Sequence, residues 1–317
     1  MKPLARRPLL ALPFLLLGRH AARAQAVLPA SSALLVPGPE SGWHARWAER
    51  LAASLAPTLA LQPACLGGPD GVTAANRFAA EDPAEVRGLL AFPGAAAHAR
   101  LIGDSRAKFD PSGWLPVCAS LGSTVVAGLG PRPTRAAPGT LKVAMPSAES
   151  ATAAALLALD LLGLTAEPRP GLPGLESDAT VALFSGPDLP ARLTAAGATP
   201  WFMLEAGPGE RDPLLADLPT LAELAPAAPA PLLAAARAAG ASARLLAVLM
   251  LPALTSADQV ALWRGAAQRW VEEEGRTPYP RAVPAAEAAA LLTLAAPPPD
   301  AVLAYREWLL RRLGWQP

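Results

Sequence analysis

The sequence has only two cysteines, no apolar run long enough to cross a membrane, and no cluster of basic residues. Cys65 and Cys118, without a nearby histidine pair, do not make a zinc site. In an oxidising compartment the two thiols can pair, and the alternative is that both stay buried and unpaired. No stretch reaches 18 uninterrupted apolar residues, so we expect no transmembrane helix.

Motifs for catalysis are missing as well. The chain has no Gly-x-Ser-x-Gly elbow, no His-Glu-x-x-His pair and no phosphate-binding glycine loop. Beyond the N-terminal segment the only histidines are His44 and His98, and His44 falls among apolar residues of a predicted helix. We therefore expect neither an enzyme nor a bound metal or cofactor.

The N-terminus has the layout of a cleaved export segment. Basic residues precede an apolar run and a small-residue stretch: Lys2, Arg6 and Arg7, then Pro8–Gly18, then Ala22-Arg23-Ala24. The apolar run is about half the roughly 20 residues that a membrane anchor needs. We expect cleavage after Ala24 and a periplasmic location, by either the general or the twin-arginine export route.

Removal of residues 1–24 also changes the charge. It takes away five of the 27 basic residues and none of the 26 acidic ones, which leaves 22 against 26 and a net charge of −4. Nucleic acids are held chiefly through phosphate neutralisation, so this chain is not expected to bind them. Because the net charge does not attract anions, any anion site must be built locally.

Extended and helical patterns alternate, which predicts an α/β fold with a mainly parallel sheet in each of two lobes. The chain of 317 residues, less these 24, exceeds what one hydrophobic core usually serves. Strands are expected at 33–36, 59–62, 89–92, 141–144, 180–184 and 201–204, and helices at 43–55, 151–162, 189–196, 257–274, 285–295 and 300–313. Residues 117–127 are expected to cross between the lobes and 131–139 to form a linker, whereas 225–238 has no assigned conformation.

A motif in the second half of the chain resembles that of a known family. Residues 211–223 read Arg-Asp-Pro-Leu-Leu-Ala-Asp-Leu-Pro-Thr-Leu-Ala-Glu. This is similar to the arginine, short spacer and Pro-Asp-Val-Pro-Thr-Leu-Ala-Glu signature of the tripartite tricarboxylate transporter substrate-binding proteins, the Bug-type periplasmic receptors. Weaker matches keep the family's order, at 109–110 with 114–117, at 168–171, at 251–255 and at 308–315. The chain thus resembles a divergent member of that family.

The resemblance implies a two-lobed Venus-flytrap fold of type II character. One lobe would hold residues 25–126 and 246–317, and the other residues 127–245. The implied function is that of a monomeric periplasmic receptor. It would capture a small carboxylate or amino-acid-like metabolite and deliver it to the permease subunits of a tripartite tricarboxylate-type transporter. The alternative is a sensory or interaction module of the same fold, which signals to a membrane partner or no longer transports.

The sequence departs from the family at three positions. Gly42 stands where the family has an aspartate four residues before the arginine matched by Arg46, and Val181 also replaces a typical aspartate. Glu149 lies in a loop that is usually glycine-rich, so it brings negative charge towards the expected carboxylate site. Either Glu149 points to solvent, or the receptor prefers a ligand that carries a cationic or neutral group.

The candidate ligand-binding residues lie mostly where predicted strands pass into helices, the edge at which ligands of open α/β folds collect. They are Ser41, Gly42, Trp43, Gly67, Gly68, Pro93, Gly94, Ser123, Ser147, Ala148, Ser150 and Arg169. Loops that open helices present free N–H groups and a positive dipole end, which suit a carboxylate. The alternative roles are structural: helix caps for Ser147 and Ser150, turns for the glycines, packing for Trp43 and simple exposure for Arg169.

Overall fold

The computed structural model describes residues 32–56, 58–80, 88–134, 139–171, 174–175, 178–204, 215–276 and 280–316. The predicted export segment and residues 211–214 of the family-like motif lie outside these ranges, as does part of the predicted linker.

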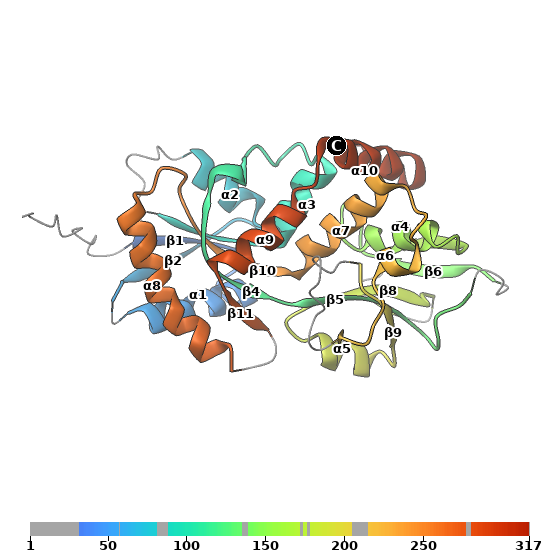
Figure 1. Ribbon diagram of the computed structural model, residues 1–317, viewed down its shortest axis with the longest axis horizontal. Coiled ribbons are helices and arrows are strands. Elements are labelled where there is room, and N and C mark those ends of the chain that lie inside the picture. Colours follow the sequence, from blue (N-terminus) through green and yellow to red (C-terminus); the bar gives the residue numbers. More distant parts are fainter. Residues whose placement is uncertain are drawn as a thin grey trace, which may run out of the picture.

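Two β-sheets lie side by side along the long axis of the molecule (Figure 1). The first has the order β11 (Arg281–Pro284), β4 (Leu115–Leu121), β10 (Leu245–Leu251), β3 (Leu89–Phe92), β1 (Ser32–Pro37) and β2 (Leu61–Leu66). The second has the order β7 (Ala166–Pro170), β6 (Leu141–Met145), β8 (Val181–Gly186), β5 (Ser123–Gly128) and β9 (Thr199–Phe202). In the first sheet β1 to β4 share one direction, and in the second β5 is antiparallel to the other four strands. The expected two-lobed α/β fold is confirmed.

The chain passes between the sheets at two adjacent points. β4 ends at Leu121 in the first sheet and β5 begins at Ser123 in the second, so the predicted crossing segment breaks at Gly122. The chain returns through α7 (Ala230–Arg244) into β10. The backbone N–H of Gly122 donates to the Arg244 carbonyl at 2.8 Å, and the Arg244 Nε donates to the Gly122 carbonyl at 3.3 Å. Hydrogen bonds therefore join the two crossings directly, while the lobe boundaries at 126/127 and 245/246 stay a prediction.

Helices cover both faces of the first sheet. α1 (Trp43–Leu55) and α8 (Ala257–Glu274) pack on one face, and α2 (Val72–Ala80), α3 (Gly94–Ile102) and α9 (Ala285–Ala295) on the other. In β3, Leu89 and Ala91 face the first group while Leu90 and Phe92 face the second, as the two-residue strand period requires. All four residues are apolar because both faces are buried.

The second sheet packs mainly under helices on one face. α4 (Ala153–Leu161), α7 and α10 (Pro299–Leu313) share a core cluster with its strands, and α5 (Leu189–Ala195) lies on the opposite face. The short helix α6 (Leu221–Leu224) begins with a capping box, in which Thr220 and Glu223 each accept the other's backbone N–H. The Thr-Leu-Ala-Glu part of the family-like motif thus has a local structural role.

Helix α10 packs against α7 and α3, helices that cover the second and the first sheet respectively (Figure 1). Towards α3, the Arg306 Nε donates to the Leu101 carbonyl at 3.1 Å, and the Trp315 indole, just after the helix, donates to the Ile102 carbonyl at 3.3 Å. Towards α4, Trp308 Nε1 and Arg312 Nε both lie 3.1 Å from an oxygen of Asp160. The C-terminal segment therefore joins α3 to α4.

No single described helix has the length and apolar composition to span a membrane. The bent pair formed by α9 and α10, at 55°, meets the length and composition requirement only when both are taken together.

The two cysteines are free thiols. Cys65 lies on β2 and Cys118 on β4, with β10, β3 and β1 between them in the sheet. At about 4.8 Å per strand, the two strands are roughly 19 Å apart. A disulfide needs Cα atoms within about 7 Å, so Cys65 and Cys118 do not form one.

Differences from the predicted elements have local causes. β2 begins at Leu61 rather than at Leu59, because the N–H groups of Thr58 and Leu59 still bond to the Leu55 carbonyl at the end of α1. The unassigned segment 225–238 contains most of α7. Its prolines do not prevent the helix, because they precede it or lie in its first turn, where no N–H is needed.

Candidate functional site

A cavity of about 490 Å³ lies between loops of the two sheets. The first sheet contributes the segments that follow β1, β2 and β3, and the second contributes those that follow β6 and β8. Representative wall residues are Trp43, Asp70 and Gly94 from the first sheet, and Ser147, Ser150 and Gly186 from the second. These segments follow the carboxyl ends of strands, where ligands of open α/β sheets bind.

The predicted site residues divide into two groups. Trp43, Pro93, Gly94, Ser147 and Ser150 line this cavity. The others do not reach its wall: Ser41, Gly42, Gly67, Gly68 and Ala148 lie in the loops beside it, Ser123 is buried at the start of β5, and Arg169 lies on β7. The role of each residue in binding stays a prediction.

Arg169 is engaged elsewhere. Its guanidinium pairs with Glu167 and, at 3.0 Å, with Asp178. β7 is an edge strand of the second sheet, and Arg169 is not part of the cavity wall. In this arrangement the guanidinium forms ion pairs along the sheet edge.

Two helices of the first sheet open onto the cavity with uncapped N-termini. Gly42 precedes α1 and Pro93 precedes α3; neither supplies a side-chain cap, and neither helix has an acidic residue in its first turn. The first N–H groups of a helix lack partners within it and carry the positive end of its dipole. Trp43 and Gly94 at these N-termini line the cavity, so both helix ends can present N–H groups to an anion.

The loop after β6 forms the opposite wall. Its turns run from Ser147 to Thr152, and α4 begins at Ala153. The Ser150 hydroxyl accepts from the Thr152 hydroxyl at 3.0 Å and from its N–H at 3.3 Å, so it shapes the turn. Glu149 is exposed overall yet belongs to the cavity wall.

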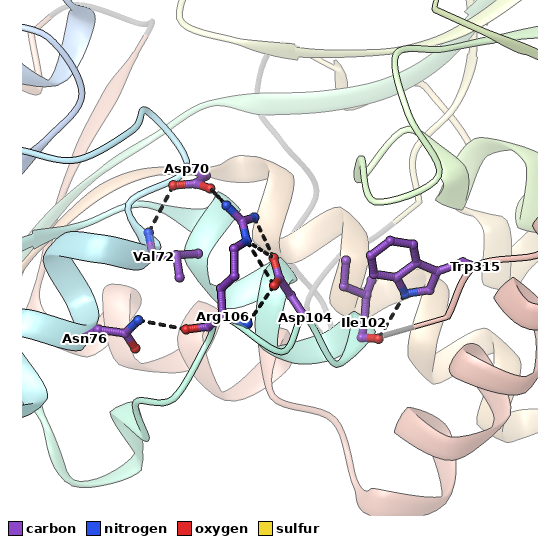
Figure 2. A network of polar contacts seen from close by, with 7 residues as sticks. All are labelled: Asp70, Val72, Asn76, Ile102, Asp104, Arg106 and Trp315. Carbon is purple, nitrogen blue, oxygen red and sulfur yellow. Dashed lines mark hydrogen bonds and ion pairs between the residues drawn. The ribbon is translucent and has the colours of Figure 1, made fainter.

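An ion-pair network occupies one side of the cavity. Figure 2 shows the Arg106 guanidinium between Asp70 and Asp104. It contacts Asp104 at 2.6 Å and Asp70 at 3.1 Å. The hydrogen bonds from Arg106 hold the pKa of Asp104 below its usual range, and the pKa of Arg106 is raised in turn.

Two buried polar side chains on the cavity wall have no hydrogen-bond partner among the described residues. His98, on α3, is 3% exposed and both its ring nitrogens are unpaired; Ser242, on α7, is 1% exposed and its hydroxyl is unpaired. Burial lowers the pKa of His98 to about 4, so the ring is neutral near pH 7. Desolvation also lowers the pKa of His44, whose Nε2 lies 3.1 Å from the Leu246 carbonyl.

Sequence reasoning missed most of this polar lining. Asp70 follows Gly67 and Gly68 by two or three residues, so its place in a strand-to-helix loop was detectable. His98 and Ser242 lie inside helices, and Asp104 and Arg106 follow the end of one. No local pattern distinguishes these four residues from ordinary surface or core positions.

A second cavity, of about 500 Å³, lies near α3, α9 and α10. It receives no residue from the second sheet and none of the predicted site residues. Within the described part of the chain, no group of three or more His, Cys, Asp or Glu side chains is arranged to hold a metal ion. The cleft between the sheets is therefore the candidate ligand site.

Comparisons with known proteins bear on the fold. Neither a protein-family model nor a curated protein matches the chain. Among solved structures, MatC from Rhodopseudomonas palustris with bound malate has a TM-score of 0.53 and 19% identity, over 88% of this chain and 98% of MatC. A TctC solute-binding protein from Polaromonas has a TM-score of 0.61 and 14% identity, over 89% and 98%. An R. palustris protein with adipate has a TM-score of 0.56 and 17% identity, over 90% and 97%.

These structures cover nearly the whole chain, and the resemblance inferred from the sequence is confirmed in the fold. The chain has the fold of the TctC- and Bug-type periplasmic solute-binding proteins.

Proposed function

We propose that this chain is a periplasmic receptor that captures a small carboxylate-containing molecule in the cleft and delivers it to a tripartite tricarboxylate-type transporter. The observation that carries the proposal is the cleft itself. Uncapped N-termini of α1 and α3 meet the loops after β6 and β8 around a cavity of about 490 Å³. This volume is within the range of small-molecule sites.

The lobes proposed from the sequence give this cleft a way to close. The connections at Gly122 and Arg244 are short and bonded to each other, so a rotation there changes the distance between the loops of the two sheets. Ligand contacts from both sides would favour the closed arrangement.

Thermal unfolding of the purified protein tests the capture step. Dicarboxylates, monocarboxylates, amino acids and uncharged sugars are added separately at about 1 mM. A ligand present at 100 times its dissociation constant stabilises the folded protein by about 2.7 kcal/mol, which raises the melting temperature by several degrees. No rise with any carboxylate-containing compound, together with no small molecule released from freshly purified protein, would contradict the proposal.

Export is tested separately in the native host. The proposed cleavage after Ala24 gives a mature protein whose N-terminus is Gln25, recovered in the periplasmic fraction. N-terminal sequencing that finds residues 1–24 still present would contradict this step without bearing on ligand capture.

A further inference from the structure

The side chains on the wall of the cleft carry more negative than positive charge. Its described lining residues include three carboxylates, Asp70, Asp104 and Glu149, and one guanidinium, Arg106. Burial keeps both lining histidines neutral near pH 7. The side chains therefore contribute a net charge of −2 to the cavity.

The guanidinium of Arg106 is already engaged with the carboxylates of the wall. Its Nε and Nη2 donate to Asp104, and its Nη1 donates to Asp70 at 3.1 Å. Asp104 keeps only 8% of its side chain exposed, so this pair is held in place. A ligand carboxylate would have to compete with two protein carboxylates for the same cation.

The remaining positive potential comes from backbone. The N-termini of α1 and α3 each correspond to roughly half an elementary charge. Together they balance about one ligand carboxylate. A dicarboxylate would bring a second negative charge towards a wall that is already negative, at a Coulomb cost that increases as water leaves the closing cleft.

His98 and Ser242 place unpaired polar groups just behind this wall. Buried donors and acceptors without partners are rare in native proteins, because each loses its hydrogen bonds to water. Both residues belong to the cavity wall, and they come from different helices. Their polar atoms are enclosed by protein, so a bound molecule would reach them only where the wall rearranges around it.

We infer that the cleft selects a small molecule with one carboxylate and one cationic nitrogen, and that it discriminates against dicarboxylates. This inference rests on the proposed function. The carboxylate binds at the N-termini of α1 and α3, and the cationic nitrogen lies near the carboxylates of Asp70, Asp104 and Glu149.

Titration calorimetry with probes matched in length tests the selectivity. The pairs are succinate with 4-aminobutyrate and adipate with 6-aminohexanoate, supplemented by L-malate and L-alanine. The aminocarboxylates are expected to bind about tenfold more tightly than the matched dicarboxylates. Equal or tighter binding of the dicarboxylates overturns the inference but supports the proposed function. If none of the six compounds binds, neither the inference nor the proposed function holds for these compounds. The molecule released from the native protein then decides, and a dicarboxylate there also overturns the inference.

The variant Glu149→Gln provides the second arm. Glu149 is exposed and no described residue forms an ion pair with it, so the fold should not depend on its charge. Loss of this charge should reduce the preference for the aminocarboxylate severalfold. The matched control is Glu272→Gln on the exposed side of α8, which should leave the preference unchanged. An unchanged preference in Glu149→Gln would show that this carboxylate does not contribute to the selectivity.

Discussion

Gly94, which lines the cleft, has no room for a side chain. A Cβ atom added there would lie 1.7 Å from the carbonyl oxygen of Ser242 and 2.7 Å from that of Leu245. Both are backbone atoms, which cannot move aside as the end of a side chain can. The close approach of α3 to the end of α7 therefore requires glycine at this position.

The variant Gly94→Ala should lower the free energy of unfolding by about 3 kcal/mol, through overpacking against backbone. The control is Gly265→Ala in α8, where no atom lies within 4 Å of the added Cβ. That change should stabilise the protein by up to about 1 kcal/mol, because alanine favours helix. Urea denaturation measures both, and a tolerated Gly94→Ala would mean that the two helices separate easily.

Ser147 and Ser150, in the loop after β6, have different surroundings, although nothing in the sequence distinguishes them. The Ser150 hydroxyl bonds to Thr152, whereas no hydrogen bond of the Ser147 hydroxyl is among the described contacts. Replacement of Ser147 by alanine thus probes ligand contact with little effect on the turn.

For Ser147→Ala we expect affinity to fall severalfold, since a hydrogen bond to a ligand contributes about 0.5–1.5 kcal/mol. Calorimetry with the tightest-binding aminocarboxylate measures the change. The melting temperature without ligand should stay the same in Ser147→Ala and decrease in Ser150→Ala. Unchanged affinity in the correctly folded Ser147→Ala variant would place the ligand away from this serine.

At the scale of elements, the packing of α10 is the feature least evident from the sequence. Its Tyr305 and Leu309 belong to the core cluster around α4 and the second sheet, while Arg306 donates to carbonyls of α3. The predicted lobe boundaries assign residues 246–317 to the first lobe. The helix has contacts with elements on both sides of that division.

Asp160→Ala should lower the free energy of unfolding by about 1–3 kcal/mol, because the Trp308 Nε1 and the Arg312 Nε lose their acceptor, while Arg312 keeps its bond to the Ala166 carbonyl. Glu307→Ala on α10 itself is the control. It removes an exposed pair with Arg311, and such pairs contribute less than about 0.5 kcal/mol. Similar losses in the two variants would show that Asp160 does not anchor α10.

At the scale of the whole molecule, the buried His98 makes stability depend on pH. In the folded protein its pKa is about 4, below the usual 6.5, because burial disfavours the charged ring. As pH falls below about 6.5 the unfolded chain binds a proton that the folded protein does not. The free energy of unfolding therefore decreases from pH 6.5 down to about pH 4, and this contribution is fully present only above pH 6.5.

The total loss attributable to His98 should reach about 3 kcal/mol over that interval. Urea denaturation at pH 7.5, 6.5, 5.5 and 4.5 measures it against His98→Gln, which cannot titrate there. The difference between the two proteins should change between pH 6.5 and 4.5 and stay constant above pH 7. The lowered pKa of Asp104 acts below pH 4, outside this interval. A constant difference at every pH would show that His98 titrates normally.

The amino-acid sequence by itself determined many of the elements and their order, although α2, α3, β7 and β11 were not predicted. The spacing of Trp43, Trp47, Leu51 and Leu55 predicted α1, and the apolar run Leu89–Phe92 predicted β3 with its observed bounds. Such patterns are local, because a helix or strand repeats its buried positions every few residues. The strand-to-helix loops also indicated where the cleft would lie, since the carboxyl ends of parallel strands share an edge.

Only the tertiary structure decided which side chains line that cleft. His98 lies a full turn inside α3, Ser242 comes from a segment 144 positions later, and Arg106 meets Asp70 across 36 positions. The separation of Cys65 from Cys118 likewise depends on strand order, which no spacing in the sequence encodes. The physical reason is that local periodicity determines which residues are buried, whereas the partners of a buried group depend on how distant elements pack together.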